Sequence, residues 1–324
     1  MRIATVGTSG ITKNLIAAFL ENKQEVVAVY SRNLEKGQKF ADEVKVKKVY
    51  TDLETMFSQT DIDVIYLASP NSLHFTHAKL ALEKGKNVII EKPICSNANE
   101  LKELIALAKA KNLFFFEAAT VLHLPNYYEI ANNLENLGQI RIVETNFSKY
   151  SSRYDNFLNG EKPNIFNPQF SAGALMDLNF YNIAFIVGLF GKAQDCHYFA
   201  NVQQGIDTSG IAVLDYGDFK AVAISGKDSN GKSLMQIQGE EGNIFVDSRT
   251  SQVKNLALQI GDDLQIMDYQ DVEDAYYYEI KEFISAFENK DRAFFDKYAK
   301  VSLDIMETLD ALRKSANIVF AADK

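Results

Sequence analysis

The sequence has few of the features that mark secreted, membrane-spanning or nucleic-acid-binding proteins. Only Cys95 and Cys196 are present among its 324 residues, too few for a disulfide framework and typical of a reducing cytoplasm. No apolar run approaches the roughly 20 residues of a transmembrane helix, and the first residues have the pattern of a strand rather than of a signal peptide. The net charge of −9 argues against nucleic acid or an anionic membrane as a partner. We therefore expect a cytoplasmic protein that binds neither of them.

The chain is longer than the size at which a single hydrophobic core usually stops growing, which predicts two domains. In the first part, short apolar runs alternate with helical patterns, as in a parallel sheet with helices on both faces. The helix expected at 97–111 starts with a capping pair, Asn97 and Glu100. The expected strands, each a nearly unbroken apolar run, are 2–6, 25–31, 64–69, 87–91 and 113–117.

After about residue 122, strand-like segments follow one another with tight turns, which predicts a mainly antiparallel open sheet. One helix is expected at 174–190, and the chain ends in helices near 276–288 and 298–320. The fold class is therefore α/β: a doubly wound Rossmann domain over 1–121, and over 122–296 an α+β domain whose sheet has helices on one face. The strands expected in this second domain are 141–149, 197–202, 210–215, 220–225, 234–238, 243–246, 256–260 and 264–267.

A glycine-containing turn follows the first strand. Such a turn presents backbone N–H groups and a helix N-terminus to a pyrophosphate. Compared with the fingerprint G-x-G-x-x-G/A, Ser9 stands at the second glycine position and Thr12 at the third. By itself the turn could merely connect two elements, but its βαβ context predicts a dinucleotide site. The residues expected to contact the dinucleotide here are Gly7, Thr8, Ser9, Gly10 and Ile11.

The end of the second strand bears on which dinucleotide is bound. NAD-binding folds usually carry an acidic residue there for the ribose 2′-hydroxyl, whereas this chain has Tyr30, Ser31 and Arg32, with Lys36 shortly after. Ser31 can donate to a 2′-phosphate, and Arg32 can pair with it or stack on the adenine. The alternative is that Arg32 is a solvated residue at the start of a loop. The pattern favours NADP over NAD.

Three segments resemble the glucose–fructose oxidoreductase/inositol dehydrogenase (Gfo/Idh/MocA) family. They are Ala-Ser-Pro-Asn-Ser-Leu-His at 68–74, Glu-Lys-Pro at 91–93 and Gly-Ala-Leu-Met-Asp-Leu-Asn-Phe-Tyr at 173–181, and the similarity extends over nearly the whole chain. The resemblance implies NAD(P)-dependent hydride transfer and a last helix, 297–324, that packs back on the first domain. It also implies a homodimer through the open face of the second sheet. Apolar positions that alternate along two neighbouring strands could supply that face, and the alternative is that they face the helix layer: Ile211, Val213, Val222 and Ile224.

The Glu-Lys-Pro motif carries the first candidate catalytic residue. The resemblance implies that Lys92 reaches the substrate hydroxyl beside the nicotinamide, that Glu91 lines the cofactor site, and that the bond to Pro93 is often cis. Physical reasoning agrees, because ligands bind at the carboxyl ends of parallel strands and a desolvated ammonium can polarise an alcohol. The alternative is that Lys92 belongs to a structural ion pair. The segment that the resemblance places against the nicotinamide ribose contains Ser69, Pro70, Asn71 and His74.

The third segment carries the other candidates. Many family members have Asp-x-x-x-His here, whereas this chain has Asp177 and Tyr181. The i, i+4 spacing predicts that both side chains lie on one helix face. A phenol has a pKa near 10, so Tyr181 needs a cation to act as a base at neutral pH, and Lys92 would supply it. Asp177 would orient substrate hydroxyls. The alternatives are that Tyr181 is a core aromatic and Asp177 a surface acid.

These observations predict an NADP-dependent enzyme that transfers a hydride to or from a carbinol carbon of a small polyhydroxylated substrate, namely a sugar, cyclitol or trans-dihydrodiol. No metal is expected, because His74 and His77 stand three residues apart without a third ligand cluster. One alternative is an NAD-dependent cyclitol or sugar dehydrogenase. A second is a non-catalytic dinucleotide-sensing or scaffold protein, which would have no need of both Lys92 and Tyr181.

Overall fold

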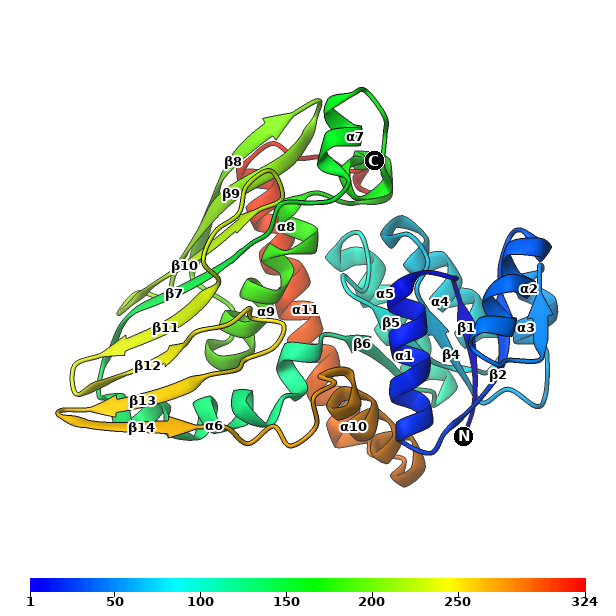
Figure 1. Cartoon of the computed structure of the whole chain (residues 1–324), viewed down its shortest axis with the longest axis horizontal. Helices are drawn as coiled ribbons and strands as arrows, with labels where there is room; N and C mark the ends of the chain where they lie inside the picture. Colours follow the sequence, from blue (N-terminus) through cyan, green and yellow to red (C-terminus); the bar gives the residue numbers. More distant parts are fainter. The chain divides into compact units, whose positions relative to one another are not determined.

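The computed structural model describes all 324 residues, and their contacts form two compact units (Figure 1). The first unit comprises Met1–Ala118 and Tyr276–Lys300, and the second comprises Ala119–Ala275 and Val301–Lys324. The first break lies three residues before the boundary expected from the sequence. Helix α11, Arg292–Ser315, contributes to both units.

The first unit contains the expected doubly wound sheet. Its six strands are parallel in the order β3-β2-β1-β4-β5-β6, so β1 pairs on one side with β2 and on the other with β4. The five expected strands are present, and the sequence missed β3, a three-residue strand whose side chains are exposed or half-buried. The strands are β1 Arg2–Val6, β2 Glu25–Tyr30, β3 Lys48–Tyr50, β4 Val64–Leu67, β5 Asn87–Glu91 and β6 Phe115–Ala118.

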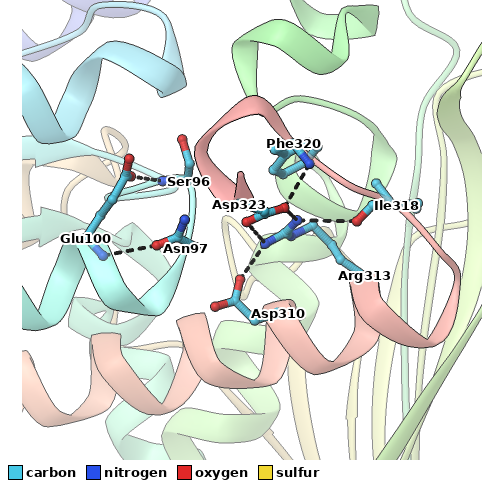
Figure 2. A network of polar contacts seen from close by, with 8 residues as sticks. All are labelled: Ser96, Asn97, Glu100, Asp310, Arg313, Ile318, Phe320 and Asp323. Atoms are coloured by element: carbon cyan, nitrogen blue, oxygen red, sulfur yellow. Dashed lines mark hydrogen bonds and ion pairs between the residues drawn. The ribbon is translucent and has the colours of Figure 1, made fainter.

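The helices of the first unit begin at side-chain caps where the sequence provides them. In α5, the amide of Glu100 donates to Asn97 Oδ1 at 3.0 Å and the amide of Ser96 donates to Glu100 Oε2 at 2.8 Å, which confirms the expected capping pair (Figure 2). Stacking of Phe116 on Phe283, at 4.9 Å between ring centroids, attaches α10 to β6. The helices are α1 Gly10–Glu21, α2 Leu34–Glu43, α3 Leu53–Phe57, α4 His74–Glu83, α5 Ala98–Lys111 and α10 Tyr276–Asn289.

The second unit contains all eight strands expected for it, in the order β14-β13-β12-β11-β7-β10-β9-β8. Every pair is antiparallel except β7 with β10, which is parallel, so the mainly antiparallel sheet is confirmed. Two short helices of this unit are α6, Pro125–Asn133, and α7, Tyr154–Leu158. The strands are β7 Ile140–Ser148, β8 Asp195–Gln203, β9 Ile206–Asp215, β10 Lys220–Gly226, β11 Leu234–Gly239, β12 Gly242–Val246, β13 Leu256–Ile260 and β14 Asp263–Met267.

The single helix expected at 174–190 is wrong, because the chain forms two helices there. Helix α8 spans Ala174–Asp177, α9 spans Asn179–Phe190, and Leu178 separates them. Buried amides hold α9 on the sheet: Asn182 Nδ2 donates to the carbonyl of Ile224 at 2.8 Å, and Asn179 Nδ2 donates to the carbonyl of Ala223 at 3.2 Å. Helix α8 has separate anchors, which are described below.

No helix by itself has the length and apolar composition needed to cross a membrane. Only the segments Pro168–Asp177 and Asn179–Phe190 taken together have that length and composition, and they are bent by 61° at the break between them. Most side chains of α9 are buried in the second unit.

A buried arginine holds the last residues of the chain against helix α11 (Figure 2). The guanidinium of Arg313, 4% exposed, donates to Asp310 at 2.6 Å and to Asp323 at 2.7 Å, and it lies 4.2 Å from the centroid of the Phe320 ring. On the same helix, Ser315 Oγ accepts from the amide of Tyr198 in β8 at 2.8 Å. Val301–Lys324 is grouped with the second unit, whereas the resemblance implied that 297–324 packs on the first domain. Packing on the first domain stays a prediction.

Candidate active site

The glycine turn has the backbone geometry that a dinucleotide site requires. Gly7 has φ +121°, and a Cβ atom there would lie 2.7 Å from the carbonyl oxygen of Ala68, so only glycine fits. Ser9 is the N-cap of α1, with its Oγ 3.1 Å from the hydroxyl of Thr12. Thr12 is fully buried and completes a capping box with Ser9, which explains why a threonine is accepted at the third glycine position. Thr8 lies in the same turn, and Gly10 and Ile11 are the first two residues of α1.

The residues expected to recognise a 2′-phosphate follow β2. Ser31 is 8% exposed and its Oγ accepts from the amide of Asn33 at 3.3 Å, while Arg32 and Lys36 are exposed. Asn33 caps α2 by accepting from the amide of Lys36 at 2.8 Å. Burial and then the positive charge of Arg32 lower the pKa of His77 on α4, so the loop after β2 and helix α4 are electrostatically coupled.

His74 links the loop after β4 to the turn after β5. Its side chain is 1% exposed, with Nδ1 2.9 Å from the carbonyl oxygen of Pro93 and Nε2 2.8 Å from that of Ser69. Burial lowers the pKa of His74 to about 4, although the two carbonyls act in the opposite direction. At neutral pH the ring is therefore uncharged and buried, so only one of its nitrogens carries a proton that can be donated to one of these carbonyls. Its expected contact with the cofactor, like those of Pro70 and Asn71 in the same segment, stays a prediction.

The turn that carries Lys92 is held on both sides. The Lys92–Pro93 peptide bond is cis, as the resemblance implied. The Pro93 carbonyl faces His74, and the amide of Ile94 donates at 2.9 Å to Glu117, whose side chain is 5% exposed. Lys92 itself is half-buried at the carboxyl end of β5. Buried polar partners therefore fix the backbone of this turn, which does not behave as a solvent-exposed loop.

Glu91, which precedes Lys92, is engaged with a buried tyrosine. The hydroxyl of Tyr66 on β4 donates to Glu91 Oε1 at 2.6 Å. Burial, and then the charge of Glu91, raise the pKa of Tyr66, so this phenol keeps its proton and continues to donate. The sequence did not single out Tyr66, because it reads as one more apolar residue of a buried strand.

Asp177 and Tyr181 belong to the second unit. Asp177 is the last residue of α8, 32% exposed, and its Oδ2 lies 2.5 Å from Nζ of Lys227. Tyr181 lies in the first turn of α9, is half-buried, and has its ring 5.9 Å from that of Phe147 on β7. Because the helix is interrupted between them, the argument that i, i+4 spacing puts both on one face of a regular helix does not hold.

Sequence reasoning missed two buried charges that hold α8. Asp207 on β9, 1% exposed, accepts from the amide of Leu175 at 2.7 Å and from the hydroxyl of Tyr198 at 3.0 Å. Burial raises the pKa of Asp207. At the other end of α8, Lys227 pairs with Asp177. A signal existed for Lys227, since it continues the i, i+2 series of buried residues on β10 that Ala221 and Ala223 belong to.

No group of three or more His, Cys, Asp or Glu side chains is arranged to hold a metal ion. The first unit offers a backbone turn fitted to phosphate and a lysine at a strand end, and the second unit offers a carboxylate and a phenol.

Comparisons with known proteins agree with this description. The family model "Oxidoreductase family, NAD-binding Rossmann fold" matches residues 1–118. The uncharacterized oxidoreductase YgjR of Escherichia coli (strain K12) is 36% identical over 326 residues, which cover 100% of this chain and 98% of the relative. The scyllo-inositol 2-dehydrogenase (NADP(+)) IolU of Bacillus subtilis (strain 168) is 34% identical over 340 residues, covering 100% and 99%.

Solved structures share the whole fold at lower identity. Levoglucosan dehydrogenase, in complex with NADH and levoglucosan, has a TM-score of 0.85 at 16% identity and covers 98% of this chain and 97% of its own. KijD10, a 3-ketoreductase from Actinomadura kijaniata in complex with NADP and TDP-benzene, has a TM-score of 0.83 at 20% identity and covers 97% of each chain. The chain belongs to the Gfo/Idh/MocA family of oxidoreductases. It is an NAD(P)-dependent dehydrogenase or reductase that acts on CH–OH groups.

The low pKa of His74 predicts a specific pH dependence of stability. The unfolded chain takes up a proton on this residue near pH 6.5, but the folded chain does so only near pH 4, so the unfolded state binds more protons in between. The free energy of unfolding therefore falls as the pH drops through this window, by about 2 kcal/mol between pH 7 and 5. His74→Asn removes the titration, and the stability difference between wild type and variant should shrink toward pH 5 in urea unfolding.

The matched control is His197→Asn on β8, because that histidine is exposed. Its stability difference from wild type should be small at both pH values. If the His74→Asn and wild-type unfolding free energies run parallel between pH 7 and 5, His74 is not held in its neutral form by burial.

Proposed function

We propose that this enzyme uses NADP(H) and transfers a hydride to or from a carbinol carbon of a small polyhydroxylated substrate, a sugar, cyclitol or trans-dihydrodiol. The observation that carries the proposal is the half-buried Lys92 at the end of β5, on a turn fixed by His74 and Glu117. Support also comes from the full-length similarity to a scyllo-inositol 2-dehydrogenase (NADP(+)) and from partial similarity to a trans-1,2-dihydrobenzene-1,2-diol dehydrogenase of Xenopus tropicalis.

The residues of the first unit suit the proposed cofactor. Gly7 lies so close to Ala68 that no side chain would fit at this position. The N-terminus of α1 supplies amide donors for a pyrophosphate. Ser31, Arg32 and Lys36 would hold the 2′-phosphate. When bound, the nicotinamide supplies the hydride donor or acceptor. The nicotinamide half would lie against the segment from Ser69 to His74 and beside Glu91.

The proton chemistry is assigned to this chain's own side chains. Tyr181 gives or takes the proton of the substrate hydroxyl, Lys92 stabilises the negative charge that develops on the oxygen, and Asp177 accepts hydrogen bonds from neighbouring substrate hydroxyls. A phenol at its ordinary pKa near 10 is a poor base at neutral pH, so the Lys92 charge is part of the same step. The rival assignment is an NAD-dependent enzyme. It is disfavoured because no acidic residue stands at the end of β2.

The first test concerns the proton-transfer pair. NADPH formation would be followed by absorbance with scyllo-inositol, D-xylose, levoglucosan and trans-1,2-dihydrobenzene-1,2-diol. On a substrate found in this way, Tyr181→Phe should lower kcat by roughly 10²–10⁴ while NADPH affinity stays unchanged. Lys92→Met should leave a residual rate that needs higher pH, because the phenol then titrates nearer its free pKa. The double variant should be little worse than the worse single variant.

Near wild-type turnover in Tyr181→Phe would assign this residue to core packing and send the search for the base elsewhere. Phe180→Leu, the neighbouring buried aromatic on α9, is the control for general damage to the helix.

The second test concerns cofactor choice. Isothermal titration should show tighter binding of NADPH than of NADH, and Arg32→Ala should weaken NADPH roughly tenfold or more because a charge-assisted contact to phosphate is lost. Binding of NADH should barely change. Lys39→Ala, an exposed cation on α2, is the matched control and should alter neither affinity. A wild-type preference for NADH would refute the NADP assignment.

The third test concerns a homodimer through the outer face of the second sheet. Phe199, Ile211 and Ile224 lie side by side in the strand register, with Phe199 62% and Ile211 42% exposed, and Val213 pairs with Val222 in the next row. Light scattering at micromolar concentration should give a dimer, and Ile211→Lys should shift it to monomer because a charge cannot be buried against an apolar face. Leu20→Lys on α1 is the control. A monomeric wild type contradicts this proposal.

A further inference from the structure

Among the lysines of the second unit that pair with a carboxylate, Lys227 is the most deeply buried. It directly follows β10, and its side chain is only 2% exposed. Other lysines in ion pairs of this chain keep 27% or more of their side chain exposed, as Lys254 does. Its Nζ lies 2.5 Å from Asp177 Oδ2 and 5.1 Å from the centroid of the Phe166 ring. A lysine ammonium is removed from water in this way only where specific partners replace the solvent.

The backbone around Lys227 is fixed from two sides. Its amide donates to the carbonyl of Thr208 on β9 at 2.8 Å, and its carbonyl accepts from the amide of Ser151 at 2.8 Å. The side chain therefore starts from a rigid point of the sheet. Its stem leads to Asp177 at the end of α8, while Asp207 holds the amide of Leu175 at the start of the same helix. The position of α8 on the sheet is thus set at both ends.

The pair is asymmetric toward solvent. The ammonium of Lys227 is covered, whereas Asp177 remains 32% exposed. Such a pair presents its acidic member outward and keeps the neutralising cation behind it. A carboxylate with a fixed orientation and a fixed charge suits a ligand that donates several O–H hydrogen bonds.

We propose that Lys227 is a positioning residue that keeps Asp177 ionised and directed toward the hydroxyl groups of a polyol substrate. The proposal rests on the proposed function for the role of the substrate, but not for the coupling of Lys227 to Asp177. Without Lys227 the carboxylate loses this cation and this hydrogen-bond donor, so it is protonated more easily and its orientation is less restricted. Lys227 does not touch the substrate, and its loss should change substrate binding rather than the chemical step.

The first measurement needs no substrate. The carboxyl pKa of Asp177 would be read from the ¹³Cγ signal in labelled protein, assigned by its loss in Asp177→Asn. In Lys227→Met, which keeps the length of the stem and removes the charge, this pKa should be higher than in wild type. Lys220→Met, on the same strand but in an exposed pair with Asp215, is the matched control and should leave the Asp177 signal unchanged. Unchanged NADPH affinity of Lys227→Met would show that the folded first unit is intact.

The second measurement uses scyllo-inositol with NADP⁺ as the probe. Lys227→Met should raise KM roughly tenfold with kcat changed little, as when an interaction common to ground state and transition state is lost. The acid limb of kcat/KM should move to higher pH. Asp177→Asn added to Lys227→Met should raise KM little further, because both changes remove the same contact.

The outcomes separate the two proposals. An Asp177 pKa that is the same in wild type and Lys227→Met overturns the inference, and so does a raised pKa with unchanged KM. A wild type that turns over no polyol contradicts the proposed function, whereas the carboxyl titration still decides whether Lys227 controls Asp177.

Discussion

The parallel pairing of β1 with both β2 and β4 is the constraint on which the cofactor half of the molecule depends. Because the strands run in one direction, the loops after β2, β1, β4 and β5 all leave the same edge of the sheet. The turn after β1 passes so close to Ala68, which follows β4, that only Gly7 fits. Glycine is therefore needed at the first position of the fingerprint, while Ser9 and Thr12 are accepted at the second and third. Strand order brings the groups together, and the glycine is required at the one position where two loops nearly touch.

Buried polar residues then convert strand ends into fixed positions. His74 is buried between the carbonyls of Ser69 and Pro93, and Glu117 accepts from the amide of Ile94, so Lys92 projects from a turn with little freedom. In the second unit, Asp207 and Lys227 perform the same task for α8. Burying each of these groups has a desolvation cost, which is offset only when its partners are well placed. In both units, the candidate reactive side chain therefore projects from a backbone segment that is held in place.

The sequence predicted those parts of the fold that depend on local pattern. Long apolar runs identified five of the six parallel strands and all eight strands of the second sheet, but β3 is too short and too exposed to produce such a run. The capping pair at Asn97 was found because both members lie within one turn. The break at Leu178 was missed, since nothing in the apolar pattern of 174–190 reveals that the helix is anchored to the sheet at separate points.

Of the candidate site, the sequence identified the residues but not their supports. Lys92, Asp177 and Tyr181 were found through a resemblance, whereas Lys227 is separated from Asp177 by 50 positions and His74 from Pro93 by 19. The sequence gives no sign of which backbone carbonyl a side chain such as His74 will contact in the fold. Such partners become visible only when the strands are assembled, because the register decides which buried position faces which loop.

The two units handle charge in different ways, and this difference bears on how one fold serves many substrates. In the first unit the cations expected at the 2′-phosphate, Arg32 and Lys36, are exposed, so they can rearrange to meet a mobile ligand. In the second, Lys227 is covered and fixed behind Asp177, so a change of substrate does not require this pair to move. If Asp177 meets the substrate as proposed, the side chains around it can change while the buried Lys227 and Asp207 keep α8 in place.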